Sequence, residues 1–210
     1  MKRIILTLIY LACWKITSAQ VWSNIQVQYD YGHGYGTITT EIGHSSSKNN
    51  GFGFVDFDFG RDEGAYFEYG FNRKITGNFF GRIEYNGGFL FDGFTPYAHG
   101  LLLGGAYQRM AGRSMIEIQL MYRMDLDYIG LTFGHGIQGC LVWGANLFKD
   151  KLYFGGNIDV NYYPARLVQF GTEMQILYCF RELGVGLEIE CENWNGKVSI
   201  HPKAMIKINL

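Results

Sequence analysis

Residues 24–31 read Asn24-Ile25-Gln26-Val27-Gln28-Tyr29-Asp30-Tyr31, so every second residue is apolar or aromatic and those between are polar. A period of two is typical of a β-strand with one apolar and one polar face, whereas an amphipathic helix repeats about every 3.6 residues. Residues 114–125 alternate in the same way, with Ile, Leu, Tyr and Met opposing Glu, Gln, Arg and Asp. The chain is therefore predicted to consist of β-strands.

The alternation recurs in about twelve segments between residue 24 and the C-terminus. The predicted strands are 24–32, 36–43, 51–59, 64–75, 78–87, 99–109, 113–125, 136–148, 151–162, 168–179, 182–193 and 197–209. Side chains fill the interior of a barrel only up to about eight strands, so twelve strands with their apolar faces inward would enclose an empty apolar cavity. With the apolar faces outward, the same strands meet lipid and enclose a polar lumen. The predicted fold is all-β, a closed antiparallel transmembrane β-barrel of about 12 strands.

The composition fits one such domain, with 29 Gly, 15 Tyr, 16 Phe and only 3 Pro. Residues 1–19 resemble a secretory signal, with Lys2 and Arg3 before an apolar run and small residues before Gln20. The expected organisation is a signal peptide over 1–19 and an outer-membrane barrel over 20–210. A lipoprotein signal acylated at Cys13 is the alternative, disfavoured because Tyr10 stands where such signals prefer Leu.

The connections between the predicted strands alternate in length. Those at 76–77, 110–112, 149–150 and 180–181 are tight, whereas those at 88–98, 126–135 and 163–167 are longer. Outer-membrane barrels have short periplasmic turns and longer extracellular loops, and an even strand count places both termini at the short side. The polar connection 44–50 is an exception to the short periplasmic turns.

The period of two also predicts which charges face the lumen. Thirteen acids are expected inside: Asp30, Glu41, Asp56, Asp58, Glu68, Glu84, Glu117, Asp125, Asp159, Glu173, Glu188, Glu190 and Glu192. Five bases accompany them: Lys74, Arg82, Arg123, Lys203 and Lys207. Ion pairs across strands can neutralise only part of this excess, so the lumen should favour cations and neutral polar solutes over anions. Acidic sugars are disfavoured as solutes.

Five short segments resemble a family of Gram-negative envelope proteins that is similar to the nucleoside-specific channel-forming outer-membrane porins (Tsx-like). The segments are 54–60 (Phe-Val-Asp-Phe-Asp-Phe-Gly), 66–68 (Tyr-Phe-Glu), 83–88 (Ile-Glu-Tyr-Asn-Gly-Gly), 172–175 (Thr-Glu-Met-Gln) and 187–190 (Leu-Glu-Ile-Glu). The likeness runs in order through nearly all of the mature chain. It implies a monomeric barrel of twelve strands that passes small solutes by diffusion, with nucleosides as the named substrate class.

A nucleoside site needs aromatic faces for the base and polar groups for the ribose hydroxyls. Tyr66 and Tyr153 are predicted to point inward, with Asn157, Asn161 and Gln119 as hydrogen-bonding partners. Acids in excess of the bases would also face permeating solute. The candidate substrate-binding residues are therefore Asp56, Asp58, Tyr66, Glu84, Gln119, Tyr153, Asn157, Asp159 and Glu173. The sequence predicts no catalytic residue, metal ligand or cofactor.

Two other functions are compatible with the sequence. One is an outer-membrane lipid hydrolase, because His44 and Ser46 lie two residues apart, although the segment 44–50 has ordinary turn composition. The other is a structural barrel whose lumen is plugged by its own side chains. The expected partners are small polar solutes, with nucleosides as a candidate, together with outer-membrane lipid and the outer-membrane assembly machinery. Net charge −1 disfavours nonspecific binding of nucleic acid.

Overall fold

The predicted strands are all present in a computed structural model, which describes residues 20–32, 34–60, 63–126, 133–164, 168–193 and 196–210. They are β1 (Gln20–Asp30), β2 (Tyr35–Ser45), β3 (Asn49–Phe59), β4 (Gly64–Thr76), β5 (Phe79–Leu90), β6 (Thr95–Ala111), β7 (Ser114–Leu126), β8 (Phe133–Leu147), β9 (Leu152–Tyr162), β10 (Gln169–Phe180), β11 (Leu183–Glu192) and β12 (Ser199–Asn209). The prediction of an all-β chain with about twelve strands is confirmed.

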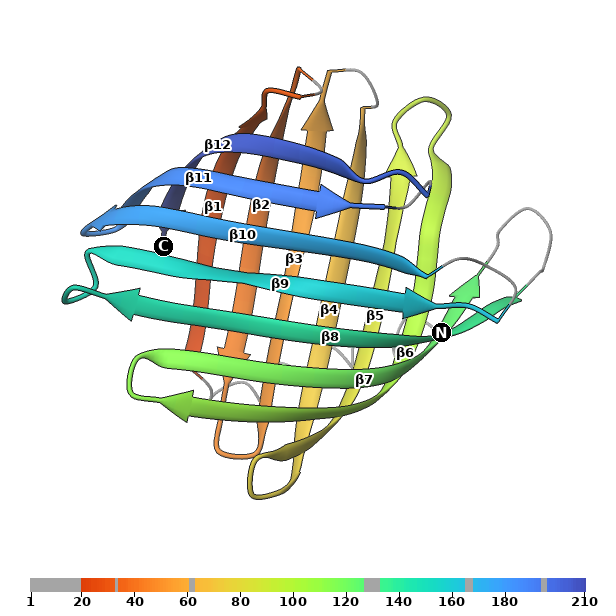
Figure 1. The fold of residues 1–210 in the computed structure, drawn as a ribbon, viewed down its shortest axis with the longest axis horizontal. Coiled ribbons are helices and arrows are strands. Elements are labelled where there is room, and N and C mark those ends of the chain that lie inside the picture. The colour runs from red at the N-terminus through yellow and green to blue at the C-terminus, as the bar shows by residue number, and fades with distance from the viewer. Residues whose placement is uncertain (1–19, 33, 61–62, 127–132, 165–167, 194–195) are drawn as a thin grey trace, which may run out of the picture.

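Every strand pairs antiparallel with its neighbours in sequence, and β1 pairs with β12 to close the barrel. The closing register sets Asn24 opposite Asn209 and Asp30 opposite Lys203. In Figure 1 the strands of one wall, β8 to β12, run across those of the opposite wall, β1 to β5. Closure gives each strand two hydrogen-bonded neighbours, so the described sheet has no free edge.

The two ends of the barrel differ in the length of their connections. We call the end where β1 begins and β12 ends the terminal rim, and the other end the far rim. The terminal rim has the connections 46–48, 77–78, 112–113, 148–151 and 181–182. The far rim has 31–34, 60–63, 91–94, 127–132, 163–168 and 193–198. The predicted alternation of short and longer connections is therefore present.

The barrel is polar inside and apolar outside. Asn24 and Gln26 each expose only 1% of their surface. Leu120 is 65% exposed on the outer face, whereas its neighbour Gln119 is 5% exposed and points inward. Because neighbouring residues of a strand point to opposite faces, this contrast fixes the apolar face of β7 outward.

Two connections are shorter than the sequence indicated. The predicted loop 88–98 is only a turn at 91–94, because β5 and β6 continue past their expected ends. A bulge between Asn86 and Gly88 absorbs a register shift in this extension. The polar segment 44–50 is likewise reduced to a turn at 46–48, in which the Ser46 hydroxyl donates a hydrogen bond to the Asn49 carbonyl oxygen (3.0 Å).

Residues 1–19, predicted to be a secretory signal, lie outside the described residues. Within the described chain, no helix is long and apolar enough to cross a membrane.

Candidate functional site: the barrel lumen

The lumen contains a cavity of about 1880 Å³, larger than the roughly 300–1,000 Å³ of a typical ligand pocket. Among the described residues, twelve carboxylates line it: Glu41, Asp56, Asp58, Glu68, Glu84, Glu117, Asp125, Asp159, Glu173, Glu188, Glu190 and Glu192. Four basic side chains join them: Arg82, Arg123, Lys203 and Lys207. Twelve of the thirteen acids expected inside therefore reach the cavity, whereas Asp30 and Lys74 do not line it.

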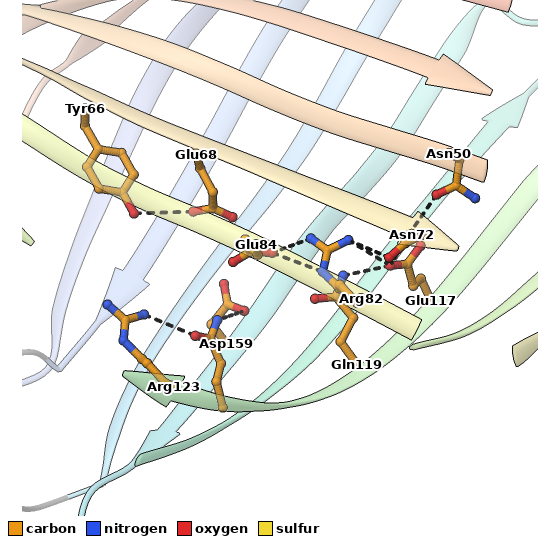
Figure 2. Close-up of polar contacts among 11 residues, drawn as sticks. Asn50, Tyr66, Glu68, Asn72, Arg82, Glu84, Glu117, Gln119, Arg123 and Asp159 are labelled. Atoms are coloured by element: carbon orange, nitrogen blue, oxygen red, sulfur yellow. Dashed lines mark hydrogen bonds and ion pairs between the residues drawn. The ribbon is translucent and has the colours of Figure 1, made fainter. Parts of the chain in front are cut away.

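Arg82 is the centre of one polar network, shown in Figure 2. Its Nε donates to Glu84 Oε2 (3.1 Å) and its Nη1 lies 3.6 Å from Glu117 Oε1. Gln119 Nε2 donates to the same Glu117 oxygen (2.8 Å), and Asn72 accepts a hydrogen bond from Arg82 Nη1 (3.2 Å). Arg82 thus neutralises Glu84, which is only 2% exposed.

The other three cations of the lumen are also paired. Lys203 Nζ lies 3.1 Å from Glu188 and 2.8 Å from Glu190. Lys207 Nζ lies 2.9 Å from Glu41. Arg123 donates from Nε to Asp125 Oδ1 (2.6 Å). The four basic side chains therefore lie among carboxylates.

Five carboxylates accept hydrogen bonds from neutral donors and form no ion pair with the described residues. We call Asp56, Asp58, Glu68, Asp159 and Glu173 the unpaired carboxylates. Their donors are Thr39 to Asp56 (2.6 Å), Thr37 to Asp58 (2.7 Å), Tyr66 to Glu68 (3.3 Å), Gln138 to Asp159 (3.2 Å) and Asn157 to Glu173 (3.2 Å). A neutral donor satisfies one lone pair of the carboxyl group and supplies no positive charge.

The unpaired carboxylates come from opposite walls and act on one another across the lumen. Glu68 on β4 is within electrostatic reach of Asp159 on β9 and Glu173 on β10. Glu173 in turn is within reach of Asp56 on β3. Figure 2 shows Glu68, Glu84 and Asp159 directed into the same region of the lumen. Carboxyl groups without a basic partner are therefore concentrated where the two walls face each other.

All nine candidate substrate-binding residues line the cavity: Asp56, Asp58, Tyr66, Glu84, Gln119, Tyr153, Asn157, Asp159 and Glu173. They do not form one compact site. Tyr66 is the third residue of β4 and lies near the far rim, whereas Tyr153 is the second residue of β9 and lies near the terminal rim. The two tyrosines therefore do not flank a common ligand. The Tyr153 ring instead lies beneath the Lys207 ammonium group, 6.0 Å from the ring centroid.

The structure also shows an aromatic row that was not identified from the sequence. Trp22, Phe52, Phe54, Tyr66 and Tyr97 all line the cavity, and we call them the aromatic track. Successive ring centroids lie 5.8, 6.3, 6.0 and 6.4 Å apart. Each separation falls within the range of directly contacting aromatic pairs. The signal available in the sequence was the alternation that points Phe52, Phe54 and Tyr66 inward, whereas Trp22 and Tyr97 lie outside the predicted strands.

A glycine allows the contact between Trp22 and Phe52 to cross a strand. Gly43 is the register partner of both Trp22 and Phe52, and a Cβ at Gly43 would overlap the Trp22 ring. The Trp22 ring occupies that space and stacks on Phe52, two strands away. A side chain on the intervening strand would separate the rings, so the track depends on the absence of a Cβ there.

His44 and Ser46 each contact residues other than one another. Tyr69, on the outer face, places its hydroxyl 3.3 Å from His44 Nδ1. The Ser46 hydroxyl is engaged with both backbone groups of Asn49, donating to the carbonyl oxygen and accepting from the amide (3.1 Å). In the described part of the chain, no group of three His, Cys, Asp or Glu side chains is placed to hold a metal ion.

The same barrel occurs in solved structures of porins. The NanC porin matches with a TM-score of 0.61 at 8% sequence identity, over 90% of this chain and 98% of that chain. The KdgM porin matches with a TM-score of 0.54 at 7% identity, over 91% and 99% of the two chains. The KdgM porin in complex with disordered oligogalacturonate gives 0.52 at 8%, over 89% and 99%.

At these identities the likeness shows a common fold, the closed porin barrel. No protein-family model matches the chain. No curated protein matches it either.

Proposed function

We propose that the protein is a passive outer-membrane channel for small polar solutes. Three observations support this function: the porin fold, the apolar outer face and a lumen with a cavity of about 1880 Å³. An apolar band around a closed barrel suits lipid, because no backbone group of the paired strands requires water. Its signal sequence over 1–19 and its monomeric state are parts of the same proposal.

The unpaired carboxylates carry the proposed selectivity. Four cations are engaged with other acids, so Asp56, Asp58, Glu68, Asp159 and Glu173 face the solute path without a basic partner. A charged wall around a narrow aqueous path attracts counter-ions and repels ions of its own sign. The channel should therefore pass cations and neutral polar solutes in preference to anions.

Nucleosides are the candidate solutes that the family resemblance suggests. Tyr66 and Tyr97 are stacked at 6.4 Å near the far rim, and Asp56 pairs with Tyr66 in the strand register. A base could lie on these rings while the Asp56 carboxylate accepts a hydrogen bond from a ribose hydroxyl. These residues replace the pairing of Tyr66 with Tyr153 that the sequence suggested.

Two observations disfavour the other functions. A plugged barrel would have its lumen filled, whereas the side chains of the described residues leave a large cavity. A lipid hydrolase would need Ser46 available as a nucleophile, whereas its hydroxyl is part of the turn at 46–48.

The test is the reversal potential of the refolded full-length mature barrel in a planar bilayer under a KCl gradient. We expect cation-selective current, and reduced selectivity in the double variant Asp56→Asn/Glu173→Gln. The matched control is Asp150→Asn, which removes a carboxylate from an exposed turn at the terminal rim. Anion selectivity would overturn the proposed charge effect, and the absence of current from correctly folded barrel would overturn the channel.

A further inference from the structure

We propose that the aromatic track binds linear, uncharged oligosaccharides and guides them through the lumen. This inference rests on the proposed channel function and names a solute class for it. It is carried by three features of the track: its length, the contacts between its rings and the carboxylates beside it.

The track runs between the two rims. Trp22 is the third residue of β1, which begins at the terminal rim, and Tyr97 is the third residue of β6, which begins at the far rim. Phe52, Phe54 and Tyr66 connect them in four steps of 5.8 to 6.4 Å. A single nucleoside covers one or two rings, so a row of five suits a solute made of repeated units.

The rings already contact one another. Trp22 and Phe52 are stacked with an interplanar angle of 28°, and Tyr66 and Tyr97 with an angle of 26°. No slot remains between the paired rings for a third ring, so a solute must lie along the faces that point into the cavity. Trp22 is 45% exposed and Phe52 is 39% exposed on the lumenal face. The apolar C–H face of a sugar ring would remove such a surface from water.

Carboxylates alternate with the rings on strands β3 and β4. In the register of these strands Phe54 lies opposite Glu68, and Asp56 lies opposite Tyr66. Each of these rings therefore has a hydrogen-bond acceptor beside it. A sugar unit has an apolar face and hydroxyl donors around its edge, so it can stack on the ring and donate to the neighbouring carboxylate.

The charge of the wall selects among oligosaccharides. The same unpaired carboxylates that accept hydrogen bonds from hydroxyls would repel the carboxylates of an acidic sugar chain. The KdgM porin was solved in complex with oligogalacturonate, which is an anionic chain. The lumen of this barrel instead favours an uncharged oligosaccharide.

The experiment uses maltohexaose as the probe and glucose, hexagalacturonate and adenosine as comparisons. In single-channel recordings, maltohexaose should interrupt the ion current, and glucose and hexagalacturonate should not. Phe54→Ala, at the centre of the track, should shorten each interruption about tenfold, the effect of losing one aromatic contact. Tyr35→Ala is the matched control, because it removes an aromatic ring that lines the cavity outside the track.

Calorimetric titration of the detergent-refolded barrel with maltohexaose separates the two proposals. If the barrel conducts cations but neither binds maltohexaose nor has its current interrupted by it, the channel function stands. The proposed binding of oligosaccharides to the track is then overturned. Binding without conductance supports the track and overturns the channel. Interruption of the current by adenosine alone would assign the rings to nucleosides and overturn the proposed binding of oligosaccharides.

Discussion

The ring of Tyr97 stacks on the ring of Tyr66 with centroids 6.4 Å apart, although the two residues lie on strands that are not neighbours. Gly88 on β5 is the register partner of both. The Tyr97 ring fills the space that a side chain at Gly88 would occupy. An aromatic residue covering a glycine of the adjacent strand therefore brings two other strands into contact.

Gly88→Ala should separate these rings while the barrel still closes. A Cβ at Gly88 would overlap the Tyr97 ring, which can rotate away because it is a side chain. We expect a loss of about 0.5–1.5 kcal/mol in unfolding free energy, the usual contribution of an aromatic pair. Urea unfolding in lipid vesicles gives the energy, and near-ultraviolet circular dichroism gives the loss of tyrosine packing.

Gly139→Ala is the control for this prediction. Gly139 lies within β8, and a Cβ there would meet no atom within 4 Å. Its substitution should leave the unfolding free energy nearly unchanged or raise it slightly. Equal losses in the two variants would show that strand glycines matter for their backbone alone and not for the ring above them.

The strands could be predicted because outward and inward residues differ in polarity at almost every position. The connection at 88–98 could not, because Gly88 and Pro96 are usual signals of a loop. In the structure Gly88 makes room for Tyr97, and Pro96 is the second residue of β6, next to the bulge between Asn86 and Gly88, and bulges tolerate proline. Both residues serve strand structure here.

The candidate site could be predicted only in part, because the alternation describes one strand at a time. The alternation of polar and apolar residues predicted that Asp56 and Glu173 point inward, and both line the cavity. Alternation along one strand gives no relation between strands, so it could not show that Arg82 reaches Glu117 or that Tyr66 and Tyr153 lie near opposite rims. Such relations depend on register around the whole barrel, which the sequence does not state.

A charge on the outer face should destabilise the barrel far more than a charge inside. Leu120 is 65% exposed on the outer face. Leu120→Arg therefore places a guanidinium group in the proposed bilayer, at a cost of roughly 2–4 kcal/mol near the midplane. Gln119→Arg adds the same group to the lumen beside Glu117 and should be tolerated. Folding into lipid vesicles measures both. If both faces tolerate arginine equally, the barrel does not span a membrane.

The Arg82–Glu84 ion pair should contribute more to stability than the ion pair of Arg113 and Asp150. The Arg82 and Glu84 side chains are 9% and 2% exposed, whereas those of Arg113 and Asp150 are 60% and 55% exposed. Arg82→Met leaves two acids without their cation and should cost about 3–5 kcal/mol. Arg113→Met should cost less than about 1 kcal/mol because water screens the exposed pair. Urea unfolding compares the two, and similar losses would contradict a buried network.

Lys203→Gln should increase the preference of the channel for cations. Lys203 neutralises Glu188 and Glu190, so the substitution leaves both carboxylates facing the lumen without a cation. One unit charge at about 8 Å in water changes the energy of an ion by roughly 0.5 kcal/mol, so the permeability ratio should rise about twofold. The exposed turn residue Lys151 provides the control Lys151→Gln.

The salt dependence of this increase distinguishes electrostatics from a change of pore shape. The Debye length falls from about 30 Å at 0.01 M to about 3 Å at 1 M salt, so an electrostatic effect should be largest in dilute KCl and small at 1 M. Reversal potentials measured across this range for the wild type, Lys203→Gln and Lys151→Gln provide the comparison. A change in selectivity that persists at 1 M would mean that the substitution altered the path itself, because screened charges cannot act over that distance.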